Sequence, residues 1–135
     1  MSVKELFNRN DELKVIVLAK RLIKHTMKLT NNIDRFPKKA RFTLVDPIQN
    51  TVIEIYKLLL KANYLNTNVR SQFEKRQECQ SEAIYLCDTL MLYIELSLDE
   101  NYINDKSCEY WVRQVIDVKR MVLSWKNGDS KRASF

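Results

Sequence analysis

Few side chains in this sequence could carry out covalent or metal chemistry. His25 is the only histidine, and the cysteines are Cys79, Cys87 and Cys108. No ExxH pair occurs, which disfavours a di-iron bundle, because such sites use Glu and His side chains from several helices. One glycine cannot supply the Gly-rich loops that bind nucleotide phosphates. We therefore expect no catalytic residues, no metal site and no cofactor, and predict that the protein is not an enzyme.

The cysteines show no CxxC spacing and are odd in number, which is typical of reduced thiols in a cytosolic protein. Helical spacing predicts inert core positions for Cys87 and Cys108, and a surface position for His25. The N-terminus is too polar for a signal peptide, and no apolar stretch is long enough to span a bilayer. These features predict a cytoplasmic protein without membrane contact.

Two acids, Asp88 and Glu95, stand seven residues apart near the edge of an apolar stripe. They are expected either to meet basic residues of a neighbouring helix or subunit, or to form a solvated edge. Both interpretations stay open at this point. Catalysis by a carboxylate pair ranks far below them, because neither acid has a histidine beside it.

The densest chemical signal is a basic and aromatic segment at residues 35–42. Its cations can contact phosphates, and an exposed aromatic ring can stack on an unpaired base. For Phe36 and Phe42 the favoured interpretation is packing of the loop onto the core. For the cations the favoured interpretation is contact with a partner. These cations are Arg35, Lys38, Lys39 and Arg41.

Charge is distributed unevenly along the 135 residues, whose formal net charge is +6. Residues 1–41 hold eleven Lys or Arg and four acids, whereas residues 70–100 hold three Lys or Arg and seven acids. This separation suits a polyanionic partner such as nucleic acid. The alternative is solvated helix faces with a surplus of lysine.

Four helices must position these groups. One glycine and two prolines favour a mostly helical chain, and apolar spacings of three and four predict helices near 11–34, 44–65, 69–98 and 105–127. The first helix should be capped at Asn10 or Asp11, and the last should stop at Gly128. Short connections favour an all-α, up-down-up-down antiparallel four-helix bundle. Residues 1–127 form one predicted domain, followed by a flexible tail at 128–135.

Cationic side chains recur every seven residues on the first and last helices, opposite their apolar stripes. Glu109 and Asp117 would partly neutralise the stripe on the last helix. The candidate nucleic-acid or partner-binding residues are Lys14, Arg21, Lys24, Lys28, Arg35, Lys38, Lys39, Arg41, Arg113 and Arg120.

The second and third helices carry more apolar surface than one bundle core can bury. The core stripes include Ile33 on the first helix, and Val45, Ile48, Val52, Ile55, Leu59 and Ala62 on the second. The surplus predicts contact with further copies of the chain. The candidate oligomer-interface residues are Ile53, Tyr56, Leu60, Tyr64, Tyr85, Leu92, Tyr93 and Leu96.

Three stretches carry a family resemblance: FPKKARFTL at 36–44, IQNTVIEIYKLLLKANY at 48–64 and VIDVKRMVLSWK at 115–126. Between about residues 11 and 127 the chain resembles the accessory variability determinant (Avd) proteins of diversity-generating retroelements. These belong to a four-helix-bundle group that includes the ribosomal-RNA intervening-sequence proteins. That second branch usually carries an IPSNIAEG-like segment in the second helix, where this chain has residues 52–60, and the departure favours Avd.

The resemblance implies a barrel-shaped, ring-like homopentamer that is not itself an enzyme. It also implies binding to a reverse transcriptase and its template RNA, in support of mutagenic cDNA synthesis, with DNA or an RNA/DNA hybrid as other nucleic-acid partners. The alternative is an oligomeric protein-interaction scaffold of the intervening-sequence group without an RNA-binding role. A bundle that encloses a cofactor is a third, disfavoured class.

Overall fold

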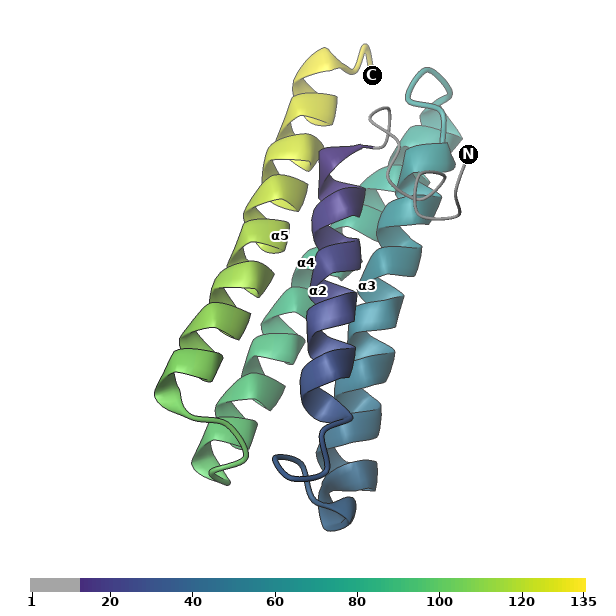
Figure 1. Cartoon of the computed structure of the whole chain (residues 1–135). Helices are drawn as coiled ribbons and strands as arrows, with labels where there is room; N and C mark the ends of the chain where they lie inside the picture. Colours follow the sequence, from purple (N-terminus) through teal and green to yellow (C-terminus); the bar gives the residue numbers. More distant parts are fainter. Residues whose placement is uncertain (1–12) are drawn as a thin grey trace, which may run out of the picture.

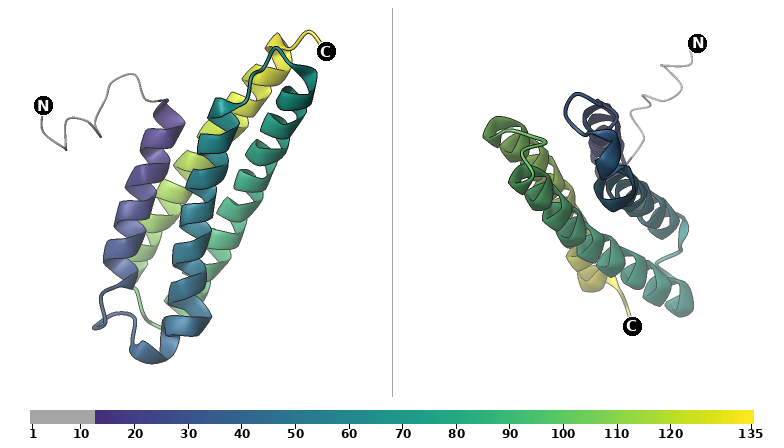
Figure 2. Two further views of the ribbon diagram at one scale, coloured as in Figure 1. Left: turned by 90° about the vertical axis from the view of Figure 1, so that its right-hand side faces the viewer. Right: turned by 90° about the horizontal axis from the view of Figure 1, so that it is seen from below.

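The computed structural model describes residues 13–135, which fold into a bundle of four α-helices. The helices are α2 (Lys14–Thr30), α3 (Asp46–Tyr64), α4 (Arg70–Asp99) and α5 (Asp105–Arg132). They run alternately down and up (Figures 1 and 2), and α2 and α4 each pack against both α3 and α5. No strand occurs within residues 13–135. The all-α, up-down-up-down four-helix bundle is thus confirmed, whereas the ring-like oligomer stays a prediction.

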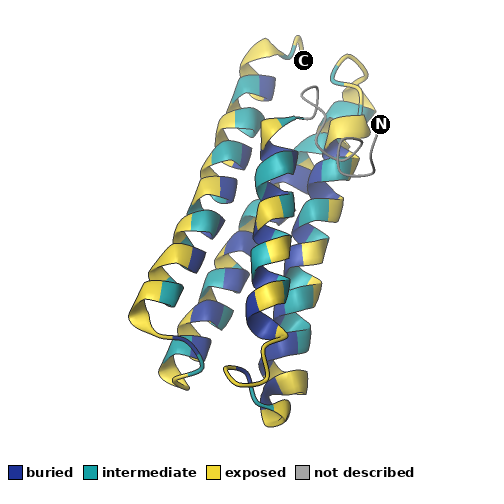
Figure 3. Ribbon diagram, viewed as in Figure 1, coloured by how far each residue is buried: buried dark blue, intermediate teal, exposed yellow. Residues whose placement is uncertain are grey.

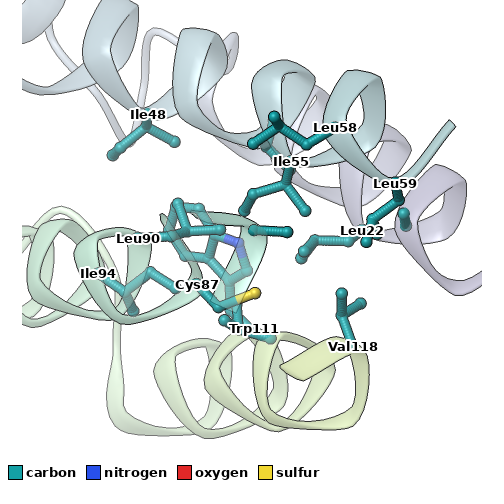
Figure 4. Close-up of a cluster of buried hydrophobic side chains, with 14 of the residues drawn as sticks. Leu22, Ile48, Ile55, Leu58, Leu59, Cys87, Leu90, Ile94, Trp111 and Val118 are labelled. Carbon is teal, nitrogen blue, oxygen red and sulfur yellow. The ribbon is translucent and has the colours of Figure 1, made fainter. Parts of the chain in front are cut away.

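The core lies along the bundle axis, where the apolar stripes of the helices meet (Figures 3 and 4). Trp111 of α5 is fully buried, and its indole N–H donates a hydrogen bond to Thr26 Oγ1 of α2 at 3.0 Å. A buried indole N–H needs such a partner, because an unsatisfied donor is costly in an apolar core. All six core positions predicted on the second helix are buried: Val45, Ile48, Val52, Ile55, Leu59 and Ala62.

The first helix ends earlier than its pattern suggests. The sequence predicts helix to Asp34, but α2 ends at Thr30 and a turn follows, in which the Asn32 carbonyl accepts hydrogen bonds from the N–H groups of Arg35 and Phe36. Ile33, predicted in the core, is 66% exposed. The prediction is therefore wrong at this end. The proposed caps Asn10 and Asp11 lie outside the described residues.

The turn between α4 and α5 is built without glycine. Asn101 has a φ of 62° just past the end of α4. The N–H groups of Asn101 and Tyr102 donate to the carbonyls of Leu98 and Ser97, the paired bonds of a Schellman motif. Asn tolerates this left-handed conformation better than most residues. The side chain of Asn104 then caps α5 by accepting a hydrogen bond from the Ser107 N–H at 2.8 Å.

The last helix does not stop at Gly128 but continues to Arg132, so the predicted helix end at Asn127 is wrong. The added turn buries Asp129, whose carboxylate accepts hydrogen bonds from Arg76 Nε at 2.7 Å and Gln80 Nε2 at 2.9 Å. Glycine within a helix costs about 1 kcal/mol relative to alanine. Losing one partner of a buried ion pair costs about 3–5 kcal/mol. The tertiary contact therefore outweighs the local preference.

Candidate nucleic-acid interface

The outer face of α2 is cationic and contains no acid. Lys14, Arg21, Lys24 and Lys28 are all exposed, as predicted from their spacing. Within residues 13–135 none of these four forms an ion pair with another side chain. No carboxylate of the described part of the chain pairs with them, so their charges are available to an external anion.

The connection between α2 and α3 adds further cations. Lys38–Ala40 forms a 3₁₀ turn and Arg41–Val45 a π-helical turn, which lead directly into α3. The four loop cations are exposed, as is their neighbour Phe42. Two of them have local partners: Arg35 Nη1 donates to Ser107 Oγ at 3.2 Å, and Arg41 Nε lies 3.0 Å from Asp46 Oδ1.

The two phenylalanines of this segment have opposite environments. Phe36 is 2% exposed and packs against Tyr102 and Trp111, with ring centroids 5.4 and 6.4 Å away. Its predicted packing onto the core is confirmed. Phe42 is 84% exposed, so the same prediction is wrong there. Because Leu44 and Val45 occupy the core positions of the π-helical turn, Phe42 points outward.

The arginines predicted on the last helix are also exposed. Arg113 forms an ion pair with Glu109, four residues earlier, so the predicted partial neutralisation holds for this arginine. Arg120 has no ion pair with any described residue. Since α5 packs directly against α2, these arginines lie on the helix beside the cationic face (Figure 1).

Net charge is concentrated in the first third of the described chain. Residues 14–45 carry nine Lys or Arg and a single acid, Asp34, whereas residues 46–135 carry twelve Lys or Arg and thirteen acids. All of the positive surplus of residues 14–135 therefore belongs to α2 and the connection that follows it.

His25 is not a simple surface residue, contrary to the prediction. Its ring is half-buried against Tyr110 and Trp111, with centroids 4.9 and 6.4 Å away, and its Nε2 has no hydrogen-bond partner among residues 13–135. Burial, together with the nearby charge of Lys28, lowers the pKa of His25. The neutral imidazole therefore acts as a packing group between α2 and α5.

The apolar surplus predicted on the second and third helices lies at the surface to different degrees. Ile53 and Tyr64 of α3 are exposed, whereas Tyr56 and Leu60 are half-buried. On α4, the side chain of Tyr93 is half-buried, and the exposed ones are Tyr85, Leu92 and Leu96. The three exposed α4 residues are seven and four apart, so they share one outward side of the helix.

The structure gives different environments to the cysteines and acids that the sequence analysis singled out. Cys87 is buried, and burial, with the charge of Asp88, raises its pKa to about 12, which suppresses the reactive thiolate. Cys108, predicted in the core, is only half-buried. Asp88 and Glu95 are both exposed, but only Asp88 has a cationic partner among the described residues, since it accepts a hydrogen bond from Lys119 of α5 at 2.7 Å. The neighbouring-helix interpretation is confirmed for Asp88.

Two general features bear on the chemistry of the described part of the chain. Residues 13–135 contain no group of three or more His, Cys, Asp or Glu side chains placed to hold a metal ion. None of the described helices is both long and apolar enough to cross a membrane.

The sequence patterns missed one polar cluster, formed by Arg76, Gln80 and Asp129. The guanidinium of Arg76 lies 4.7 Å from the ring centroid of Trp125 and donates to the carbonyl of Leu65, just past the end of α3. Arg76 and Asp129 are 53 residues apart. No local pattern relates such distant positions, so only the tertiary fold reveals the pair.

Comparison with known proteins supports the fold. No protein-family model matches the sequence, and a search of curated proteins found no significant match. A crystal structure of a protein of unknown function from the S23 ribosomal protein family of Bacteroides thetaiotaomicron is similar, with a TM-score of 0.64 and 14% sequence identity. The match covers 85% of this chain and 99% of that chain. The chain therefore shares the helical-bundle fold of that protein.

Proposed function

We propose that this protein is a non-catalytic, homo-oligomeric accessory factor of a diversity-generating retroelement that binds template RNA and a reverse transcriptase. One observation carries the RNA-binding part: residues 14–45 hold nine Lys or Arg against one acid, on the exposed face of α2 and the following connection. A surface of this kind attracts a polyanion over distances of about 10 Å at moderate salt.

The binding mechanism is electrostatic. Each lysine or arginine that contacts a phosphate releases a condensed counterion, so the affinity falls as salt is added. Arg21, Lys24 and Lys28 need not break an ion pair with a described residue first. Arg41 and Arg113 would have to exchange Asp46 and Glu109 for a phosphate. We therefore assign the larger share of the binding energy to α2.

The protein partners are assigned to the apolar surface. Exposed side chains on α3 and α4 suit a second copy of the chain, which supports a homo-oligomer. The reverse transcriptase is proposed from the resemblance of residues 36–44, 48–64 and 115–126 to Avd proteins. The proposal that this chain is itself non-catalytic rests on the same resemblance.

The double variant Arg21→Glu with Lys28→Glu tests the RNA-binding face. We expect its affinity for single-stranded RNA to fall at least about tenfold at low salt. The log–log dependence of affinity on salt should become shallower by about 1.4, because two phosphate contacts are lost. Fluorescence anisotropy of a labelled RNA measures both quantities, and circular dichroism checks that the helices persist.

The matched control is Lys57→Glu with Lys61→Glu, which makes the same change in charge on exposed residues of α3. Both lysines belong to α3 and lie outside α2 and the connection that follows it. The control should lose much less affinity. Equal losses in the two double variants would show that α2 is not the binding face. A wild-type protein that retains no RNA at low salt would favour the protein-interaction scaffold instead.

A further inference from the structure

A pocket of about 320 Å³ opens where the end of α2 meets the connection to α3. Its lining combines aromatic, cationic and amide groups, among them Asn31, Phe36, Lys38, Arg41 and Phe42. We infer that this pocket binds one unpaired base of single-stranded RNA, with the base stacked on Phe42 and its flanking phosphates on Lys38 and Arg41. The inference rests on the proposed RNA-binding function and assigns a specific contact within it.

The ring of Phe42 is exposed to solvent, whereas residues that follow it in the same turn are packed in the core. Phe42 is 84% exposed, yet it belongs to the π-helical turn Arg41–Val45, in which Leu44 and Val45 are buried. A π-helical turn is rare and is found frequently at functional sites. The buried neighbours hold the backbone in place, so the exposed ring is available for stacking without a large ordering cost.

The polar groups of the pocket complement a nucleotide. Lys38 is exposed, and Arg41, whose Nε lies 3.0 Å from Asp46 Oδ1, would exchange this carboxylate for a phosphate. Asn31 Oδ1 accepts a hydrogen bond from Gln49 Nε2 at 2.8 Å. Within the described residues the amide N–H groups of Asn31 have no acceptor. They can therefore donate to the carbonyl or ring nitrogen of a base.

The size of the pocket selects among nucleic acids. Ligand pockets typically enclose about 300–1,000 Å³, so this one is at the lower limit and suits a single flat ring system. A base held in a duplex cannot enter, because its faces are covered by stacked neighbours. Stacking on an aromatic side chain tolerates any base, since every base has a π-face. The pocket therefore recognises single-stranded character rather than a particular sequence.

The test compares Phe42→Leu, which keeps an apolar side chain but removes the ring, with Phe42→Tyr, which keeps the ring. We expect Phe42→Leu to bind single-stranded RNA about 5- to 100-fold more weakly, with an unchanged log–log salt slope, because stacking releases no counterions. Phe42→Tyr should bind within about twofold of wild type on the same argument. A 2-aminopurine base in the RNA should lose fluorescence on binding wild type but less on binding Phe42→Leu.

The control is Phe135→Leu, which removes a ring that is 52% exposed at the C-terminus, at the end of the bundle opposite the connection between α2 and α3 (Figure 1). It should leave the affinity for RNA unchanged. The pocket assignment fails, and the proposed function stands, if wild type binds RNA and Phe42→Leu binds it equally well. The assignment also fails if Phe42→Leu weakens duplex and single-stranded RNA to the same degree. A wild-type protein that does not bind RNA overturns both proposals.

Discussion

At the scale of single residues, Arg76 and Asp129 connect three helices. Arg76 donates to both oxygens of Asp129 on α5 and to the carbonyls of Ala62 and Leu65 at the end of α3. Burial tends to raise the pKa of Asp129, but hydrogen bonds from Arg76 and Gln80 and the charges of Arg76 and Arg132 lower it overall. The ion pair therefore stabilises the ends of α3 and α5 at neutral pH.

Asp129→Asn tests this contribution. At neutral pH we expect the free energy of unfolding to fall by about 3 kcal/mol, because Arg76, whose side chain is 11% exposed, loses its counterion. Since the folded-state pKa of Asp129 is lowered, the contribution of the pair is present above the unfolded pKa, about 3.9, and is lost as the pH falls through the folded value. Urea unfolding between neutral and acidic pH should show the two proteins converging in acid.

The control for this variant is Asp117→Asn, on an exposed site of the same helix. It should change the stability by no more than about 0.5 kcal/mol. A similar small effect of Asp129→Asn at neutral pH would contradict the role given to the ion pair.

The sequence predicts the exposure of charged residue types more reliably than the surroundings of a single aromatic side chain. The ten cations were placed on the surface correctly, because lysine and arginine are almost never fully buried without a partner. Phe42 and His25 were assigned to the wrong environments. For Phe42, the sequence predicted a loop that packs onto the core, but residues 41–45 form a π-helical turn in which Leu44 and Val45 take the buried positions. For His25, the decisive contacts come from Tyr110 and Trp111 on another helix.

At the scale of helices, apolar periodicity predicted the number, order and central residues of all four. It did so because each helix buries one stripe against its neighbours, and stripes repeat every three or four residues. The ends were less predictable. Thr30 closes α2 although the apolar pattern continues to Ile33, and the ion pair of Asp129 extends α5 past Gly128. Helix ends depend on turn and tertiary contacts that periodicity does not contain.

Gly128→Ala tests whether α5 is continuous. In the middle of a helix, alanine should raise the free energy of unfolding by about 0.4–1 kcal/mol. An added Cβ would lie 3.2 Å from Arg132 Nη1, and this exposed side chain can move aside. Thermal or urea unfolding measures the change. A loss of stability would indicate that residue 128 adopts the left-handed conformation of a helix terminus instead.

At the scale of the whole molecule, two surfaces have separate chemistry. The cationic face belongs to α2 and the connection after it, and the exposed residues of the predicted oligomer interface belong to α3 and α4. The charge imbalance could be read from the sequence by counting. The sequence does not show where these charges lie in space. In the bundle, α2 packs between α3 and α5, so its acid-free outer side forms one exposed cationic face.

A matched pair of variants tests whether oligomer formation depends on the predicted interface or on any exposed leucine. Leu96 of α4 is 40% exposed and belongs to the predicted oligomer interface, whereas Leu123 of α5 is 38% exposed and does not. Leu96→Lys should dissociate the oligomer, because a charged side chain is costly in an apolar interface, and Leu123→Lys should leave it intact. These variants serve as controls for the measurement below.

The most direct test of the account is sedimentation velocity of the wild-type protein with a labelled single-stranded RNA at about 50 mM and about 500 mM salt. We expect an oligomer that carries RNA at low salt and the same oligomer without RNA at high salt, because salt weakens phosphate contacts but not apolar ones. A monomer that sediments apart from the RNA at both salt concentrations would contradict the account.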